Sequence, residues 1–127
     1  MSNNSVATVV PNDREDCKQI SNVEYNEYLQ AMGKFAVEEH THNMSGIERK
    51  FISVGFAVVC SVPVGGDKYH LLVKVDEFIL APSFPKYEKL YMATVLHNKV
   101  NHSWALLRFE NVAPPTVYPP SIDYLDA

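Results

Sequence analysis

Histidine is the residue type in this sequence that most directly raises the question of metal chemistry, and five are present. His40 and His42 are two positions apart in a segment of good helix formers, so on a helix they point about 200° apart and cannot share an ion. His97 and His102 flank a short loop and could come together, but two imidazoles without a third ligand make a poor zinc site. We therefore expect solvated loop histidines, no metal and no other cofactor.

Carboxylates offer a second possible chemistry. Asp76 and Glu77 are neighbours at the end of an alternating run, and neighbours in a strand point to opposite faces, so they are not expected to act as a pair. Tyr91, His97 and Asp76 would be the acid–base candidates of a catalytic site, but nothing in their spacing brings them together. The sequence also lacks nucleophile-elbow, phosphate-loop and zinc-protease patterns. We expect a protein that is not an enzyme.

Composition limits the partners and the compartment. A net charge of −4 and a pI near 5.7 argue against non-specific nucleic-acid binding, which needs a basic face. No apolar run approaches the ~18 residues of a membrane span, and the first residues lack the basic start of a signal peptide. The expected location is cytoplasmic as written, or secreted if a signal peptide has been removed.

Cysteine usage fits the cytoplasmic expectation. Cys17 and Cys60 are the only two cysteines, too few to predict a disulfide framework, so both are expected to be free thiols that act as small buried apolar residues. Glycosylation sequons begin at Asn3, Asn43 and Asn101, and they matter only if the chain is secreted.

One long helix is predicted in the first half of the chain. Ser21 precedes Glu24 by three positions, a capping-box pattern that predicts a helix start. The helix should end near His42, with Asn43 in the left-handed conformation. Gly33 lies inside the helix, where a missing Cβ would allow close approach to a sheet. Apolar residues at spacings of three and four indicate one buried stripe: Tyr25, Tyr28, Leu29, Met32, Phe35 and Ala36.

The rest of the chain predicts strands. Residues 52–60 carry apolar side chains at even positions, which is the period of a strand with one buried face. Residues 69–75, 90–97 and 104–109 predict three further strands, and residues 17–20 a short strand before the helix. We predict an α+β fold in which one long α-helix packs on a curved, four- to five-stranded antiparallel sheet.

Domain boundaries follow from changes in composition. Residues 1–15 are polar and predict a disordered arm, and residues 16–112 hold all the predicted elements of one domain. Residues 113–127 contain four of the eight prolines and predict a proline-rich tail that cannot pair inside a sheet.

Residues 32–40, MGKFAVEEH, resemble the helix signature of the plant cystatin family, the phytocystatins. The order helix, hairpin, hairpin is similar to that family, as are KLYMATV at residues 89–95 and the position of Trp104. The similarity covers roughly residues 16–111 and implies a cystatin-like fold. LLRFENVAPP at residues 106–115 also resembles the C-terminal part of monellin, a sweet-tasting plant protein of cystatin fold that is not known for protease inhibition.

The cystatin resemblance implies an inhibitory wedge with three parts: an N-terminal segment with a glycine, a first hairpin loop and a second hairpin loop with a tryptophan. No glycine precedes Gly33, so the first part is absent or altered. The first loop departs from the family pattern at Ser61 and Pro63, and Ser103 replaces the usual proline of the second. The protease-binding residues implied by the resemblance are Ser61, Val62, Pro63, Val64, Gly65, Ser103 and Trp104.

The function implied by the cystatin resemblance is reversible inhibition of papain-like cysteine proteases, with such a protease as the partner and with degenerate inhibitory loops. The alternative is a monellin-like binding or taste-active protein without inhibition. A third option is a catalytic or small-molecule-binding derivative of the fold, which a closed polar cavity beneath the helix would favour. The chain is expected to be a monomer or a dimer formed by hairpin exchange, with no nucleic-acid or membrane partner.

Overall fold

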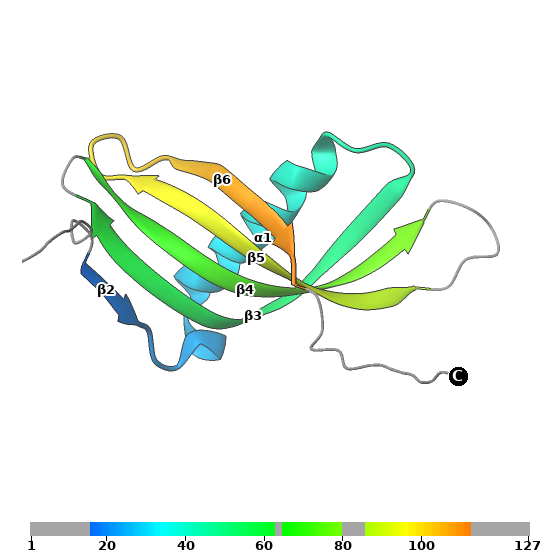
Figure 1. Cartoon of the computed structure of the whole chain (residues 1–127), viewed down its shortest axis with the longest axis horizontal. Helices are drawn as coiled ribbons and strands as arrows, with labels where there is room; N and C mark the ends of the chain where they lie inside the picture. The colour runs from blue at the N-terminus through cyan, green and yellow to red at the C-terminus, as the bar shows by residue number, and fades with distance from the viewer. Residues whose placement is uncertain (1–15, 63–64, 80–85, 113–127) are drawn as a thin grey trace, which may run out of the picture.

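The described part of the protein folds as one helix laid across one antiparallel sheet, which confirms the predicted class (Figure 1). The computed structural model describes residues 16–62, 65–79 and 86–112. The predicted arm 1–15, the predicted tail 113–127, and loop residues Pro63 and Val64 therefore lie outside the described residues. The elements follow the chain in the order β2 (Asp16–Gln19), the 3-10 turn η1 (Val23–Tyr25), α1 (Glu27–His42), β3 (Ile47–Val62), β4 (Gly66–Ile79), β5 (Tyr87–Asn98) and β6 (Trp104–Asn111).

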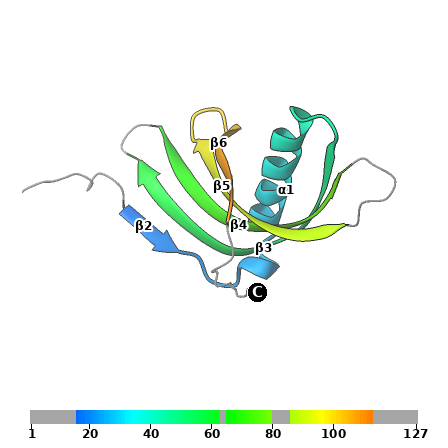
Figure 2. The same ribbon diagram turned by 45° about the vertical axis from the view of Figure 1, so that its right-hand side comes forward.

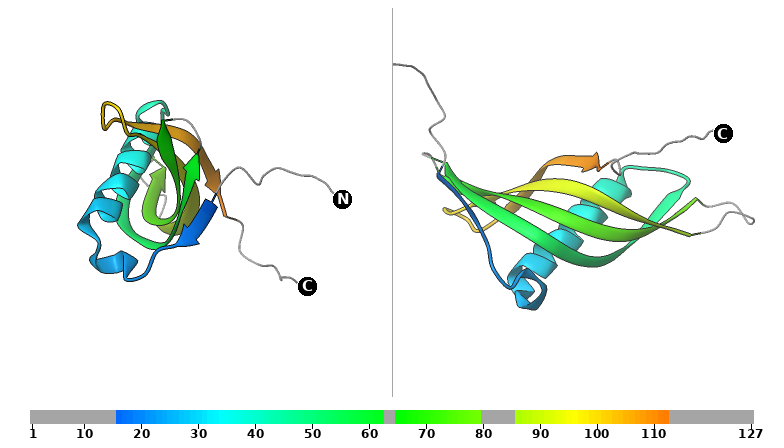
Figure 3. Two further views of the ribbon diagram at one scale, coloured as in Figure 1. Left: turned by 90° about the vertical axis from the view of Figure 1, so that its left-hand side faces the viewer. Right: turned by 60° about the horizontal axis from the view of Figure 1, so that its bottom comes forward.

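The five strands lie in the order β2-β3-β4-β5-β6, and every pairing is antiparallel. The sheet curves around α1, which lies on its concave face (Figure 2). Seen from one end, the strands wrap partly around the helix (Figure 3). No helix within the described residues has the length and apolar character needed to cross a membrane.

The helix starts and ends differently from the sequence prediction. Asn26, not Ser21, is the N-cap of α1, and its side-chain oxygen accepts a hydrogen bond of 3.1 Å from the Leu29 amide. The predicted capping box is therefore wrong, because residues 23–25 form a separate 3-10 turn that leaves Tyr25 81% exposed. The predicted end at His42 is confirmed. Asn43 has φ −92°, so its predicted left-handed conformation is wrong.

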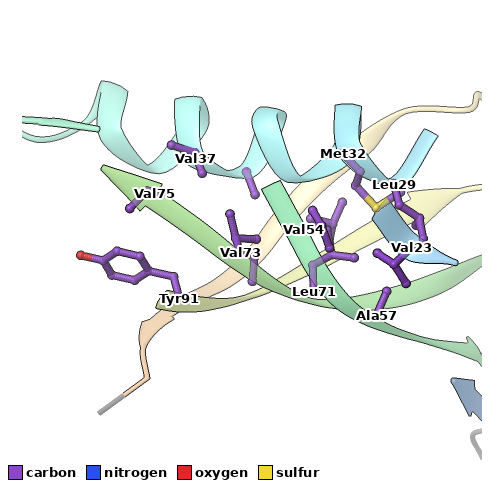
Figure 4. Close-up of a cluster of buried hydrophobic side chains, with 13 residues drawn as sticks. Val23, Leu29, Met32, Val37, Val54, Ala57, Leu71, Val73, Val75 and Tyr91 are labelled. Carbon is purple, nitrogen blue, oxygen red and sulfur yellow. The ribbon is translucent and has the colours of Figure 1, made fainter. Parts of the chain in front are cut away.

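The core lies between α1 and strands β3 to β5 (Figure 4). Gly33 is buried against β3: a Cβ there would overlap Val54 Cγ2 and lie 3.0 Å from Phe51 Cε1. The close approach expected for this glycine is therefore present, and it lets the helix sit directly on the sheet. The side chains that fill this layer are almost fully buried: Leu29, Met32, Ala36, Val37, Val54, Ala57, Leu71, Val73, Val75, Ala93 and Val95.

Strand β3 does not keep the simple alternation predicted for residues 52–60. Its pairing with β4 shifts register between Phe51 and Ser53 and again between Val54 and Phe56. Each irregularity adds a residue to one strand and reverses which side chains face the helix. Ile52 and Phe56, predicted to be buried, are consequently 41% and 37% exposed, while Ala57 is fully buried.

Candidate functional site

The two hairpin turns predicted from the sequence, β3–β4 and β5–β6, lie together at one end of the sheet. The Lys99 amide donates a hydrogen bond of 2.9 Å to the Gly65 carbonyl, which joins the β5–β6 turn to the β3–β4 turn. Gly66 is paired with Asn98, and a Cβ on Gly66 would lie 2.6 Å from the His97 carbonyl oxygen. The two turns therefore form one continuous rim, which is seen at the upper left of Figure 1.

The first strand brings a third segment to this rim. In the β2–β3 pairing, Asp16 lies opposite Ser61, so the chain enters the described structure beside the first hairpin. Cys17 and Cys60 are paired in the same ladder and form a disulfide. The prediction of two free thiols is therefore wrong: two cysteines 43 positions apart are placed directly opposite each other by the short strand.

The first hairpin is described except at its tip. Ser61 is exposed and Val62 is half-buried at the end of β3, while Gly65 has φ +78° and requires glycine. Pro63 and Val64, predicted to bind a protease, lie outside the described residues. Asp67 and Lys99 form an ion pair of 3.5 Å between the two hairpins, which adds a charged contact to the backbone link.

The second hairpin is a turn fixed by asparagine side chains. Asn98 Oδ1 accepts hydrogen bonds from the amides of Val100 (2.8 Å) and Asn101 (3.3 Å). Asn101 Oδ1 accepts from the amide and the hydroxyl of Ser103, at 3.0 Å and 2.6 Å. His102 has φ +58° and turns the chain back. Val100, at the tip of the turn, is 84% exposed, an apolar side chain that the sequence analysis did not select.

Trp104 begins β6 as expected, but its ring turns toward the helix. Its Nε1 donates a hydrogen bond of 3.1 Å to the Tyr28 hydroxyl. Its ring also makes edge contacts with Tyr28 and Phe35, both at 5.5 Å between centroids. The described geometry thus makes Trp104 a link between the second hairpin and α1, with only part of its surface available to a partner.

The other chemical candidates do not form a site. His97 and His102 do come together, with rings stacked at 5.7 Å, yet within the described ranges no group of three His, Cys, Asp or Glu could hold a metal. Asp76 and Glu77 face opposite sides of the sheet, as expected, because only Glu77 is paired with the inward-facing Arg49. Tyr91 lies six residues from His97 along β5, so these two and Asp76 are not assembled for catalysis.

A buried charged cluster, which we define as Arg49, Glu77, Lys89, Tyr91 and His40, was missed by the sequence analysis. Arg49 Nε donates to Glu77 Oε1 at 2.8 Å, and the Tyr91 hydroxyl donates to the same oxygen at 2.5 Å. Lys89 Nζ lies 3.0 Å from Glu77 Oε2. The side chains of Arg49 and Glu77 are only 4% and 9% exposed, so the charges are held away from water.

Hydrogen bonding decides the charge of Glu77. Burial alone would raise the pKa of this carboxyl, but the hydrogen bonds from Tyr91, Lys89 and Arg49 outweigh it and leave the pKa below its ordinary value. Burial and the bond to Glu77 raise the pKa of Tyr91. The hydrogen bond to Glu77 raises the pKa of Lys89. The cluster is therefore a carboxylate surrounded by cations and a neutral phenol.

His40 adds a neutral imidazole to this cluster. Arg49 Nη1 lies 3.1 Å from His40 Nδ1, and because arginine has only donors, Nδ1 must accept and the imidazole must be neutral. Burial and the nearby Arg49 charge lower the pKa of His40. Its ring is stacked on Phe109 at 4.4 Å. Both Glu77 oxygens are already engaged, so we assign the cluster to holding the helix end on the sheet.

One sequence signal could have found the cluster. Leu71, Val73 and Val75 are buried at alternate positions of β4, and the next position of that series is Glu77. A carboxylate that continues a buried apolar face requires a cation beside it.

One hollow of about 340 Å³ opens at the other end of β5, lined by Tyr87, Glu88, Lys89, Leu90, Asn111 and Val112. It lies away from the packed layer beneath α1, where the third option of the sequence analysis would place a cavity.

Comparison of the chain with protein-family models, curated proteins and solved structures finds no match.

Proposed function

We propose that this chain is a cystatin-like protein whose rim of two hairpins inserts into the cleft of a papain-like cysteine protease and blocks it reversibly. The resemblance of residues 32–40 to the phytocystatin helix supports the family, and one helix on an antiparallel sheet is the architecture that this resemblance implies. The observation that carries the proposal is the 2.9 Å hydrogen bond between Lys99 and Gly65, because it holds both loops on a single projecting edge.

The second turn of the rim is suited to docking because its own hydrogen bonds fix its shape. A turn held by the side chains of Asn98 and Asn101 loses little conformational entropy when a partner binds. The departures from the family pattern change which residues would make contact. Ser61 and Gly65 remain at the first turn, the Trp104 ring is engaged with Tyr28, and Val100 is the exposed apolar side chain of the second turn. We therefore assign the apolar contact of the second hairpin to Val100.

Titration of papain with the full chain tests the proposal. The wild-type chain should inhibit, and Val100→Asp should weaken inhibition on the order of tenfold or more, since it places a charge at a desolvated contact. Leu107→Asp is the matched control, because Leu107 is also exposed, at 53%, but lies in the middle of β6, away from the rim. Absence of inhibition by the wild-type chain at high micromolar concentration would end the inhibitor proposal.

A non-inhibitory binding protein of monellin type is the second candidate, and the position of Trp104 favours it. An indole that donates its only N–H to Tyr28 and packs on Phe35 is less available to a protease than a projecting one. Under this alternative the wild-type chain would leave papain activity unchanged while remaining folded by circular dichroism. The same titration therefore separates the two candidates.

The disulfide bears on the proposed compartment. Disulfides persist in oxidising environments, so Cys17–Cys60 favours the secreted alternative over the cytoplasmic one. In a secretory pathway the sequon at Asn101 would be a glycan acceptor on the rim. A glycosidase-sensitive mass shift that maps to Asn101 would favour a non-inhibitory protein, because a glycan there would obstruct entry into a narrow cleft.

A further inference from the structure

Strand β2 is the most weakly attached element of the rim. All four of its residues are exposed, and it contacts β3 alone among the described helices and strands. A four-residue edge strand is marginal by itself, since short two-stranded pairings have little stability in water. Beyond its ladder with β3, the attachments seen among the described residues are the disulfide, a 2.9 Å hydrogen bond from the Ile20 amide to the Ala57 carbonyl, and the packing of the half-buried Ile20 side chain against the core.

The core does not depend on this strand. Its buried side chains come from η1, α1, β3, β4 and β5, and none comes from residues 16–19. Strand β3 keeps its long pairing with β4 whether or not β2 is present. Detachment of β2 would therefore remove one part of the rim and leave the helix and the other four strands in place.

We propose that the Cys17–Cys60 disulfide is a redox-operated clasp that holds strand β2 against the first hairpin. When the disulfide is intact, Asp16 lies beside Ser61 at the rim. When it is reduced, β2 separates from β3 and Asp16 is no longer held at the binding edge. The consequence for protease binding rests on the function proposed above, whereas the release of β2 does not.

The reaction is thiol–disulfide exchange with a dithiol reductant. Cys17 is exposed, whereas Cys60 is 2% exposed, so the incoming thiolate attacks the Cys17 sulfur. The Cys17–Cys60 bond breaks, Cys60 leaves as a thiolate that takes a proton, and a mixed disulfide remains on Cys17. The second thiol of the reductant then attacks this mixed disulfide and releases Cys17. Two electrons pass to the protein, and the reductant becomes a cyclic disulfide.

Hydrogen exchange on the full chain tests the release. The oxidised wild type is compared with the dithiothreitol-reduced wild type and with Cys17→Ala/Cys60→Ala, which cannot form the bond. Peptides that cover residues 16–20 should exchange at least about tenfold faster without the disulfide, while peptides within residues 71–75 keep their protection. Unchanged exchange at residues 16–20, or loss of protection throughout the sheet, would overturn the clasp.

The site of attack has its own test. Oxidised protein is incubated with limiting glutathione, trapped by acid and analysed by peptide mass spectrometry. The mixed disulfide should be found on Cys17, and its presence mainly on Cys60 would contradict the mechanism.

Binding to papain separates this inference from the proposed function. Papain with a carboxymethylated active-site cysteine needs no reductant, so calorimetry can compare the oxidised wild type with Cys17→Ala/Cys60→Ala directly. Binding should be weaker by roughly tenfold in the double variant, because the freed segment must be ordered again on docking. Equal binding by both would remove the regulatory role. If neither binds, the proposed function fails, and the exchange experiment alone decides whether the clasp exists.

Discussion

The two ends of the sheet use polar groups in opposite ways. At the end near the helix C-terminus, Arg49 and Glu77 are buried and their charges are paired. At the rim, the side chains of Asn98 and Asn101 accept hydrogen bonds from amides of their own turn, while Val100 faces solvent. The first arrangement fixes the helix on the sheet, and the second fixes the shape of an exposed turn.

Stability and binding should therefore respond to substitution at different ends of the sheet. A buried charge that loses its partner is costly, whereas an exposed apolar tip contributes little to folding. We therefore expect substitutions in the buried charged cluster to lower the free energy of unfolding, and substitutions at the tip of the rim to change only binding.

Replacement of Arg49 should give the largest loss of stability. Arg49→Met removes the cation beside Glu77 and leaves a nearly buried carboxylate with Lys89 as its remaining charge partner. Breaking a buried pair in this way costs about 3–5 kcal/mol. Urea denaturation followed by circular dichroism measures the difference.

Arg108→Met is the matched control for that prediction. Arg108 also pairs with a glutamate, Glu110, at 3.4 Å, but the two side chains are 67% and 60% exposed. Exposed pairs contribute about 0–1 kcal/mol. Similar losses for Arg49→Met and Arg108→Met would show that the buried ion pair contributes no more to the free energy of unfolding than an exposed one.

Gly33→Ala should be the next most damaging change, although alanine is the better helix former. The new Cβ would overlap Val54 Cγ2, which is buried and has little room to move. Overpacking costs about 1–3 kcal/mol, against a helix-propensity gain of about 1 kcal/mol, so we expect a net loss of up to about 2 kcal/mol.

Gly55→Ala provides the comparison for Gly33→Ala within the same helix–sheet region. Nothing lies within 4 Å of a Cβ placed on Gly55, and its φ is not positive. The variant should be within about 0.5 kcal/mol of wild type. A stabilising effect of Gly33→Ala would mean that α1 sits further from β3 than the structure shows.

At the rim, Trp104→Phe should lower stability by about 1 kcal/mol, because it removes the hydrogen bond to Tyr28 and part of the ring packing. Val100→Ala should have almost no effect on stability, since Val100 is 84% exposed. Thermal unfolding of both variants gives the comparison. A larger loss of stability for Val100→Ala than for Trp104→Phe would contradict the assignment of Trp104 to holding the hairpin on α1 and of Val100 to contacting a partner.

The long elements were predictable because their patterns repeat. Leu29, Met32 and Ala36 recur at helical spacing, and Leu71, Val73 and Val75 alternate, so several positions support each prediction. Asn26 was missed as the N-cap because Ser21 and Glu24 satisfy the same local rule. Local patterns cannot choose between two competing caps, since that choice depends on how η1 packs against β3.

The site was less predictable because it depends on contacts between distant residues. The Cys17–Cys60 bond follows from the pairing register of β2 with β3, which neither strand specifies alone. Two register shifts in β3 moved Ile52 and Phe56 away from the helix. Gly55 lies at the second shift and is a residue type that marks bulges, but no residue of the run marks the first. Trp104 was placed correctly along β6, but the direction of its ring is set by Tyr28, 76 residues earlier.

A further effect expected of the buried charged cluster is a pH dependence from His40. The pKa of His40 in the folded protein is below the ordinary 6.5. As pH falls below about 6.5, His40 is therefore protonated in the unfolded chain before it is protonated in the folded protein. Stability is therefore complete above that pH and declines below it, by no more than about 1.4 kcal/mol per pH unit. The Glu77 carboxyl, whose pKa lies below 4.5, begins to contribute its own loss only below that value. Urea denaturation between pH 7.5 and 5 should show the decline in wild type.

His40→Gln isolates the contribution of the imidazole, because glutamine does not titrate. The pH dependence between 7.5 and 5 should be smaller in His40→Gln than in wild type. His42→Gln, two positions later on the same helix with an exposed side chain, is the control and should retain the wild-type dependence. If His42→Gln rather than His40→Gln flattened the profile, the acid sensitivity would come from the solvated face of α1. The buried charged cluster would then not account for the pH dependence, and the electrostatic difference between the two ends of the sheet would be contradicted.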